Sequence, residues 1–381
     1  MKICVIVINS VWYDPRVRKQ IVEYLRCGED VTAVGYKCAR YDAQKVAQIP
    51  VPTNIVSVDK YRGHQRSPIK KLRREALRNE ALTRAIVETK PDVIHANDYN
   101  ALVPAFRAAK ILGCKLVYDS HEVCVENDFA KRFPGAFIRY MRWNERRMCR
   151  RVDQMVCVSH AAADYFVETY GIAKPMVITN CALAREAITS EEKNIGFEIL
   201  NHGQFYAGRG YDLMVEAAPL LKDLPEIRLA MRGFGVIEEQ LRQRKEELGA
   251  DNVVFYPKVL VQELIPQAAR SHVGVAITEP ICLNFKLSVS NKLFEYAAAG
   301  LPVIMSDIPE HRYLNEKYDF GIILPEITTE AFAEAVRTLY TDKALYERLA
   351  KNAMKLSRQV NWEAEFSRLI KTERELVYGK K

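Results

Sequence analysis

Short apolar runs rich in β-branched residues alternate with amphipathic helical segments along almost the whole chain. This alternation is typical of parallel β-sheets covered by helices. Strands are predicted first at KICVIVIN, DVTAVGY, NIVSVD, DVIHAND, CKLVYDSHE, QMVCVSH and PMVITN. A second series begins near Ile199 with EILNHGQF, IRLAMRGFG, NVVFYP, VGVAITE and PVIMSD. The sequence therefore predicts two doubly wound α/β domains in tandem.

A polar segment separates the two series of strands. Residues 181–197, CALAREAITSEEKNIGF, show no sustained periodicity and are predicted to be an interdomain linker. This leaves an N-terminal domain over residues 1–180 and a C-terminal domain over residues 198–362. The chain has 381 residues, of which about half are hydrophobic, so each domain can bury a core of its own. The last residues, about 363–381, are predicted to form a helix.

Positive charge is concentrated in the first half of the chain. Residues 1–180 hold 30 Lys and Arg against 19 Asp and Glu, and the remaining residues hold 26 against 29. Two segments dominate this excess, SPIKKLRREALR and AKRFPGAFIRYMRWNERRMCRR, and the second interleaves aromatic and basic residues. Basic helices with bulky apolar residues suit an anionic membrane surface or another polyanion, but a solvated helix face over an ordinary core gives the same pattern. No nucleic-acid-binding module accompanies the charge, so a nucleic acid partner is not expected.

The sequence predicts a cytoplasmic protein. No stretch approaches the roughly 18 to 20 apolar residues of a membrane span, and the N-terminal apolar run meets Tyr13 and Asp14 too early for a signal peptide. The nine cysteines include no Cys-x-x-Cys pair and are expected to be reduced thiols. The basic segments leave peripheral attachment to the inner face of the membrane open.

Ligands of open parallel sheets bind beyond the carboxyl ends of the strands, so polar residues at strand ends are the first candidates for a site. In HGQFYAGRGYDLMVEA, residues 202–217, Gly203 allows a tight exit from a strand and Arg209 precedes a helix start. A fixed cation and the amides of a helix start can together hold a phosphate. Because glycine-rich turns are common in α/β proteins, this signal is weak by itself.

A second candidate is the segment NKLFEYAAAGLPVIMSD, residues 291–307, which places Glu295 in an otherwise apolar helix. Ser288 or Ser290 is expected to cap this helix, and its first amides would offer a seat for a phosphate. One or two turns further, the Glu295 carboxylate can accept hydrogen bonds from a vicinal diol such as that of a ribose. The alternative is an exposed ion pair with Lys292, but the apolar flanks favour a ligand-binding role.

These segments lead to a resemblance that covers nearly the whole chain. The order GRG…EA, RGFG, NVVFYP, SNKLFEYAAAGLPVIMSDIPE and NWE resembles family 4 of the retaining, nucleotide-sugar-dependent glycosyltransferases. DVIHAND, LVYDSHE and VCVSHAAADYF are similar to the acceptor-side domain of that family. The resemblance implies the GT-B architecture, in which two Rossmann-like domains face a central cleft. It also implies that the C-terminal domain binds the donor and that the last helix packs back on the N-terminal domain.

The resemblance also implies roles for individual residues. Glu295 would hold the ribose, Arg209 the pyrophosphate, and His121 would lie beside the reacting sugar, so these three are the candidate catalytic residues. His95 is expected to be structural. The candidate donor-binding residues are Gly203, Gln204, Arg209, Gly235, Ser288, Ser290, Asn291, Lys292 and Glu295.

The chain departs from the family pattern at three places. The family usually has a Glu eight residues before the helix Glu, but position 287 is Leu, so Asn284, Lys286 or the amides near Ser288 would have to contact the sugar. The first of two basic positions at the pyrophosphate is occupied by Gln204. NSVWYDPRVRK replaces the usual glycine-rich loop after the first strand, so Arg16 and Arg18 are candidates for contact with acceptor or phosphate.

The resulting hypothesis is a hexosyltransferase that moves a sugar from a nucleoside diphosphate sugar to a lipid-linked or polysaccharide acceptor, as in the synthesis of cell-envelope glycans. No covalent cofactor is expected, and no metal, because no Asp-x-Asp pair ends a strand. Two alternatives stay open. One is a nucleotide-sugar epimerase on the same architecture, and the other is a polyanion-binding protein whose sites have decayed.

Overall fold

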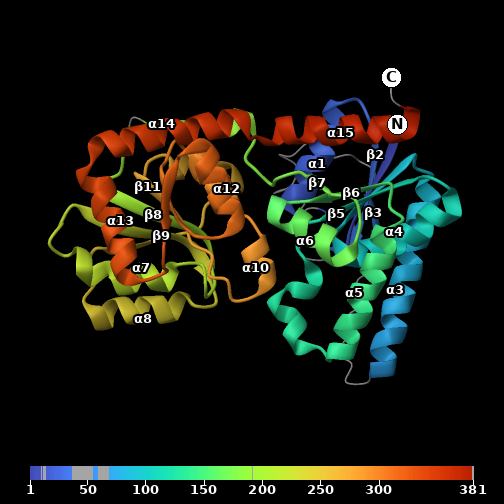
Figure 1. Ribbon diagram of the computed structural model, residues 1–381, viewed down its shortest axis with the longest axis horizontal. Coiled ribbons are helices and arrows are strands. Elements are labelled where there is room, and N and C mark those ends of the chain that lie inside the picture. Colours follow the sequence, from blue (N-terminus) through green and yellow to red (C-terminus); the bar gives the residue numbers. More distant parts are fainter. Residues whose placement is uncertain (10, 12–13, 37–54, 59–67, 191, 380–381) are drawn as a thin grey trace. The chain divides into compact units, whose positions relative to one another are not determined.

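The computed structural model describes residues 1–9, 11, 14–36, 55–58, 68–190 and 192–379, with side chains described at all of these except 55–58, 68–72 and 129. The chain divides into two compact units (Figure 1). The first unit comprises Met1–Thr179 and Glu365–Lys381, and the second comprises Asn180–Ala364. Each unit is a parallel sheet covered by helices, so the predicted fold class of two doubly wound α/β domains is confirmed.

The first unit is built on a seven-stranded sheet in the order β3-β2-β1-β4-β5-β6-β7, in which neighbouring strands are parallel. Its first strand is buried from Ile3 to Val7, as expected of a parallel strand that helices cover on both faces. The strands are β1 (Lys2–Val7), β2 (Asp30–Tyr36), β3 (Ile55–Val58), β4 (Val93–Asn97), β5 (Lys115–Ser120), β6 (Gln154–Cys157) and β7 (Met176–Val177). The helices between them are α1 (Pro15–Arg26), α3 (Pro68–Thr89), α4 (Asp98–Leu112), η1 (Cys124–Glu126), η2 (Asp128–Arg132), α5 (Gly135–Cys149) and α6 (His160–Tyr170).

The second unit has a six-stranded parallel sheet in the order β10-β9-β8-β11-β12-β13. Its strands are β8 (Phe197–Phe205), β9 (Ile227–Gly235), β10 (Val253–Tyr256), β11 (Val273–Ala276), β12 (Val303–Ser306) and β13 (Gly321–Leu324). Its helices are η3 (Ala184–Glu186), α7 (Tyr211–Ala217), η4 (Ala218–Leu221), α8 (Glu238–Leu248), η5 (Val261–Glu263), α9 (Leu264–Ala268), α10 (Leu283–Leu287), α11 (Asn291–Ala298), α12 (Pro309–Tyr318), α13 (Thr329–Thr341) and α14 (Lys343–Gln359).

Each sheet has one point where the order of its strands reverses, and these points fix where a ligand can bind. In the first sheet β1 lies between β2 and β4, and in the second β8 lies between β9 and β11. Crevices outside the carboxyl ends of strands form at such reversals in open α/β sheets. The residues that follow β1 and β4 in the first sheet and β8 and β11 in the second are therefore the ones to compare with the predicted site residues, together with those that follow β5, beside β4.

The last helix, α15 (Trp362–Tyr378), belongs to the first unit from Glu365 onward. The Phe366 ring packs against the Tyr24 ring at a centroid distance of 4.7 Å. Further along α15, Arg374 pairs with Glu29, and Glu373 accepts a hydrogen bond of 2.7 Å from the Tyr24 hydroxyl. The C-terminal residues thus complete the packing of a unit that begins at Met1.

Four further observations bear on the predictions from sequence. The segment 181–197 was expected to be a linker, and it hydrogen-bonds within the second unit, where the Ile188 amide donates to the Ala298 carbonyl (2.8 Å). Strand β13 was not predicted, because its four residues, GIIL, are too short a run to separate from the helices on either side. The described cysteines are free thiols. No helix among the described residues is long and apolar enough to cross a membrane.

Candidate active site

The loop that carries Arg209 is anchored at both ends by buried rings. Phe205 ends β8, Tyr211 begins α7, and their ring centroids are 4.7 Å apart. Just before Tyr211, Gly210 has a φ of +76°, and a Cβ there would lie 2.6 Å from the Ile277 Cβ. Only glycine fits this position, so the predicted glycine-rich turn is a close approach of the loop to the end of β11.

Arg209 is held at the carboxyl ends of β8 and β11. Its guanidinium donates a hydrogen bond of 3.1 Å to Thr278 Oγ1 and lies 4.2 Å from the centroid of the Phe285 ring. The Arg209 carbonyl accepts a hydrogen bond of 3.0 Å from the side-chain amide of Asn201. Stacking and hydrogen bonding fix the direction of a planar guanidinium, which suits it to bidentate recognition of phosphate.

Lys292 lies on the first turn of α11 and reaches the same strand end. Its Nζ donates to Asn201 Oδ1 at 2.6 Å and to the Tyr211 hydroxyl at 3.3 Å. Burial, and next the positive charge of Arg209, lower the pKa of Lys292 to about 7. Asn201 therefore contacts the Arg209 carbonyl and the Lys292 ammonium. Because the pKa of Lys292 lies well below its ordinary value of 10.5, a bound anion would stabilise the charged form of this side chain.

Glu295, one turn beyond Lys292, pairs with a residue that the sequence analysis did not select. Its Oε2 lies 2.7 Å from Nε2 of His202, and its side chain is 28% exposed. The expected alternative, an exposed pair with Lys292, is not what the structure shows. The His202 ring packs against Tyr296 at 4.5 Å, so one imidazole orients the carboxylate from the strand below the helix. His202 follows Asn201 where β8 changes from apolar to polar residues, which is the signal that could have identified it.

The start of α11 differs from the expectation in its capping. Ser290 occupies the N-cap position, but its side chain makes no capping hydrogen bond, and Ser288 Oγ instead donates to the Phe285 carbonyl at 2.9 Å. The prediction that Ser288 or Ser290 caps the helix by accepting an amide hydrogen bond is therefore wrong. Asn291, the first helical residue, is exposed. The Leu293 amide donates to the Ser290 carbonyl at 3.1 Å, and a helix start without a side-chain cap can bind an anion through its other first amides.

The remaining donor-side candidates lie around this group. Gly203 lies within β8, two residues before the end of the strand at Phe205, and has a φ of +123°. Gln204, the next residue, is exposed. Gly235 pairs with Phe205 at the end of β9, where a Cβ would lie 2.2 Å from the Phe205 carbonyl oxygen, so strand packing already requires this glycine. Of the two residues considered in place of the missing Glu, Asn284 is buried and Lys286 is exposed.

In the first unit, His121 follows β5 directly and contacts the end of β4. Its Nε2 lies 3.0 Å from Asn97 Oδ1, and its Nδ1 lies 3.4 Å from Asp98 Oδ2. Asp98 has a φ of +69°, a strained conformation for a residue other than glycine, and also accepts a hydrogen bond from the His121 amide. Burial works against the charged ring, but the carboxylates of Asp98 and Asp119 outweigh it and raise the pKa of His121.

Arg16 lies inside the first unit. Only 3% of the residue is exposed, and its guanidinium binds Asp119 through Nε at 2.9 Å and Nη2 at 3.0 Å. Arg18, on the same helix, is half-buried. Asp119 is fully buried, and the Arg16 charge overcomes the effect of burial and holds the pKa of Asp119 well below its usual range.

His95, expected to be structural, is fully buried in a network that includes the last helix. Its Nδ1 lies 2.9 Å from Glu373 Oε1, and its Nε2 lies 3.4 Å from Asp119 Oδ2. Burial favours the neutral ring, but hydrogen bonds to Asp119 and Glu373 raise the pKa of His95 to about 9. Gln20 and Tyr24 also contact this imidazole.

The structure thus forms two groups from the predicted residues, one in each unit. Arg209, Lys292 and Glu295 are brought together in the second unit, and His121 lies in the first unit near the buried Arg16. Among the described residues, no group of three or more His, Cys, Asp or Glu side chains is placed to hold a metal ion.

Comparison with known proteins gives matches to both halves of the chain. Residues 22–182 match a family described as Glycosyltransferase Family 4, and residues 196–342 match one described as Glycosyl transferases group 1. Phosphatidyl-myo-inositol mannosyltransferase of Mycobacterium leprae (strain TN) is 23% identical over 295 residues, which cover 76% of this chain and 74% of that protein.

Two solved structures are similar over essentially their full length. Sucrose-phosphate synthase from Thermosynechococcus elongatus has a TM-score of 0.79 at 15% identity and covers 100% of both chains. Anabaena HepE, in complex with UDP and glucose, has a TM-score of 0.74 at 17% identity and covers 98% of both chains. At this identity the likeness concerns the fold.

Proposed function

Because this chain belongs to glycosyltransferase family 4 and has the GT-B fold, we propose that it is a retaining enzyme that uses a nucleoside diphosphate sugar. Its acceptor in this proposal is a lipid-linked or polysaccharide glycan at the cytosolic face of the membrane. The observation that carries the proposal is that two cations lie at the reversal point of the second sheet, the Arg209 guanidinium held by Thr278 after β11 and the Lys292 ammonium held by Asn201 of β8.

Two cations at one strand end suit a diphosphate. Arg209 has a fixed guanidinium, Lys292 donates to an amide oxygen and a hydroxyl, and the first amides of α11 lie next to Lys292 in the chain. We assign the diphosphate to these three groups. The structural neighbour HepE was solved with UDP, so UDP is the first nucleotide to test.

Glu295 is assigned to the ribose. Its carboxylate is oriented by His202 and remains partly exposed one turn after Lys292, where a sugar attached to the diphosphate would begin. A carboxylate held in one direction can accept both hydroxyls of a vicinal diol. His121 is assigned to the reacting sugar by the resemblance to the family, and Gln204, Gly235 and Asn284 remain candidates for the wall of the pocket.

The proposed chemistry depends on stabilising a leaving group. The bond between sugar C1 and the phosphate oxygen breaks, a bond from C1 to the acceptor oxygen forms, and negative charge grows on the departing diphosphate, which takes up the proton that the acceptor hydroxyl releases. Preorganised cations and amides at that position lower the barrier without reorganising as the charge develops. Arg209, Lys292 and the start of α11 are the groups of this chain that can do so.

Replacement of Glu295 with alanine tests the ribose assignment. The wild-type protein is expected to bind UDP more tightly than 2′-deoxy-UDP, and the variant should bind the two equally. Loss of a hydrogen bond to a charged group is worth about 1.5–3 kcal/mol, so UDP affinity should fall by roughly 10- to 100-fold. Calorimetric titration of both nucleotides into both proteins gives the four affinities required.

Glu334→Ala, at an exposed position of α13, is the matched control and should leave all four affinities unchanged. GDP and ADP, each paired with its deoxy form, extend the experiment to the other bases. If no nucleoside diphosphate at millimolar concentration stabilised the wild-type protein against heat, the proposed function would be abandoned in favour of a decayed site.

Binding of the diphosphate is expected to take up a proton near Lys292. In the free protein its pKa is about 7, and a bound diphosphate would raise that pKa because the charged form gains a partner. Between the two pKa values the complex holds more protons than the free protein, so nucleotide affinity should fall by up to about tenfold per pH unit as pH rises. Calorimetry in buffers of different ionisation enthalpy measures the proton directly.

Lys292→Met should remove both the proton uptake and this part of the pH dependence, whereas Lys317→Met on α12 should retain them. Equal proton uptake by the Lys292→Met variant would show that another group titrates.

The epimerase alternative is separated by incubating the protein with a nucleotide sugar alone. Appearance of an epimer without any acceptor would favour that alternative, whereas transfer that requires an acceptor supports the proposal.

A further inference from the structure

One side of α5 exposes a stripe of aromatic side chains. Phe137, Tyr140 and Trp143 are 40%, 55% and 58% exposed and follow one another at three-residue intervals on the helix. The Phe137 ring also packs against Phe133, at a centroid distance of 5.4 Å, and the Tyr140 and Trp143 centroids are 6.1 Å apart. We call these four side chains the aromatic stripe. Large apolar side chains grouped on a surface mark a site of interaction.

The aromatic stripe is not part of the core of the first unit, because the opposite side of α5 packs into that core. Met141, Glu145 and Met148 are buried there, and Glu145 accepts hydrogen bonds of 2.6 Å from the hydroxyls of Tyr118 and Tyr170. Glu145 is also the only acidic residue between Gly135 and Cys149. The exposed side of α5 therefore carries aromatic and basic residues and no carboxylate.

Basic side chains border the stripe along its length. Arg139, Arg146, Arg147, Arg150 and Arg151 are exposed. The Arg147 guanidinium lies 5.6 Å from the centroid of the Trp143 ring and 5.9 Å from that of Phe106. Arg147 thus connects the aromatic stripe to a cavity at the end of α5.

That cavity has a volume of about 450 Å³ and is lined by three cations, Lys110, Arg147 and Arg151. Its one carboxylate, Asp153, is already engaged by the Lys115 ammonium at 2.9 Å and the Leu116 amide at 2.9 Å. The remaining lining, which includes Phe106, Cys114 and Leu116, is largely apolar. A cavity with three cations and one neutralised carboxylate suits a phosphate attached to an apolar group.

We propose that the aromatic stripe and this cavity bind the surface of a bilayer that contains anionic phospholipid, with a lipid phosphate in the cavity. Trp and Tyr favour the headgroup level of a membrane, where a ring can be buried and a polar tip hydrated, and basic side chains beside them attract anionic lipid. This binding rests on the proposed function in one respect, since it would place the enzyme beside the proposed lipid-linked acceptor. The binding itself depends on neither donor nor acceptor.

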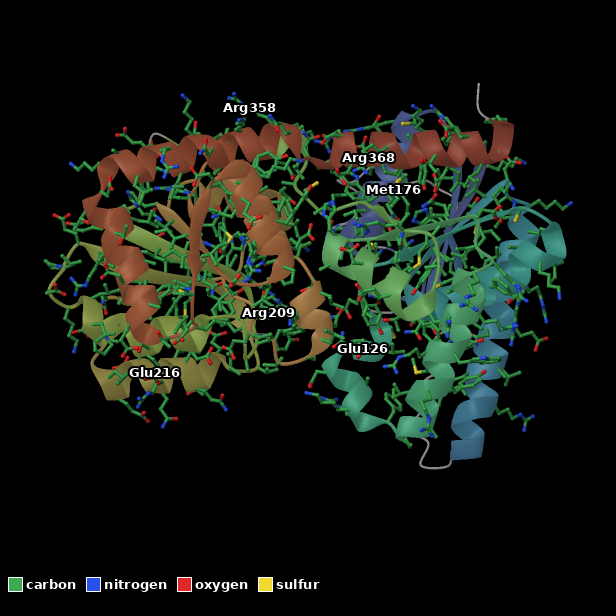
Figure 2. The ribbon with its side chains drawn as sticks, in the orientation of Figure 1. Glu126, Met176, Arg209, Glu216, Arg358 and Arg368 are labelled. Carbon is green, nitrogen blue, oxygen red and sulfur yellow. The ribbon has the colours of Figure 1, made fainter. Side chains whose placement is uncertain are left out.

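The test is co-sedimentation of the full-length protein with vesicles of phosphatidylcholine alone and vesicles that also contain phosphatidylglycerol. Binding should need the anionic lipid and weaken with salt. Each basic side chain near such a surface changes binding by a factor of about five, so Arg147→Glu with Arg151→Glu should weaken it by at least about 25-fold. Lys355→Glu with Arg358→Glu, an equal change of charge at exposed positions of α14, should weaken it far less (Figure 2).

Trp143 supplies a second measurement. Lipids brominated on their acyl chains should quench the fluorescence of the wild-type protein, and Trp143→Phe should lose that quenching. Of the other two tryptophans, Trp362 is fully buried, and Trp12→Phe should retain the quenching. Leu260→Ser with Val261→Ser, at exposed apolar positions of the second unit, should keep it.

Equal binding to neutral and anionic vesicles, or wild-type binding by the Arg147→Glu/Arg151→Glu variant, would overturn the proposal. Displacement by inorganic phosphate or single-stranded RNA with no quenching of Trp143 would also overturn it and indicate a site for soluble polyanions. Glu295→Ala should bind vesicles as the wild type does. Failure to bind vesicles would therefore not contradict the proposed donor site, and failure to bind nucleotides would not contradict the proposed membrane site.

Discussion

Arg209→Ala is expected to lower kcat by roughly 10²–10³-fold, which is the loss typical of removing one preorganised group at a developing negative charge. The guanidinium is fixed by Thr278 and by stacking on Phe285, so no other side chain can replace it without moving the loop. Transfer of sugar from a labelled donor to the acceptor measures the rate.

The variant should remain folded, because Arg209 is only half-buried and its loop is anchored by Phe205 and Tyr211. Arg209→Lys should recover part of the lost rate, since it restores the charge but not the fork of the guanidinium. Arg228→Ala, at an exposed position near the amino end of β9, serves as the control and should have the wild-type rate.

A second readout distinguishes loss of charge from loss of shape. The charge of Arg209 contributes to the low pKa of Lys292, so Arg209→Ala should raise that pKa and shift the pH dependence of nucleotide binding upward. A variant with a normal rate and an unshifted pH profile would remove Arg209 from the site.

Asp119→Ala is expected to destabilise the first unit by about 3–5 kcal/mol, the range found when one partner of a buried ion pair is removed. The carboxylate is fully buried and accepts hydrogen bonds from Arg16 and from Gln20 at 2.7 Å. Its removal leaves the Arg16 guanidinium in the core without this carboxylate, and leaves the His95 imidazole with Glu373 as its carboxylate partner. Urea unfolding of the full-length protein, followed separately for each unit, measures the change.

Asp119→Asn keeps the volume of the side chain and supplies a folded variant should the alanine variant fail to fold. Asp153→Ala removes a partly exposed partner of Lys115 and should cost at most about 1 kcal/mol. If Asp119→Ala were no more destabilising than this control, the buried network would have no structural role.

The same network makes a pH dependence that can be checked. The pKa of His95 is raised from 6.5 to about 9 in the folded protein, so its stabilising effect is complete below about pH 6.5 and is lost as pH rises through about 9. Asp119→Asn should flatten this part of the stability profile, because Asp119 is one of the two groups that raise the pKa.

The sequence predicted what depends on local pattern and missed what depends on which strands are neighbours. Both domains, the loop with Arg209 and the helix with Lys292 and Glu295 followed from periodicity, glycine positions and helix signals. The partner of Glu295 did not, because His202 is 93 positions away and becomes its neighbour only when β8 lies under α11.

Arg16 shows the same limit from the other side. As an isolated basic residue after the first strand it could be interpreted as a ligand-binding cation, and the structure pairs it with Asp119, 103 positions later. Ser290 was identified at the right position, but whether its side chain or a ligand satisfies the helix amides is not a property of the local sequence.

The position of α15 has a consequence for synthesis. Phe366 and Glu373 contact Tyr24 and His95, so the first unit draws core residues from a segment that is translated after the whole second unit. While the second unit is being translated, Tyr24 and His95 of the nascent first unit lack the α15 residues that they contact in the folded protein. Premature termination anywhere in the second unit would therefore yield a first unit without the α15 residues of its core, and quality-control proteases would degrade it.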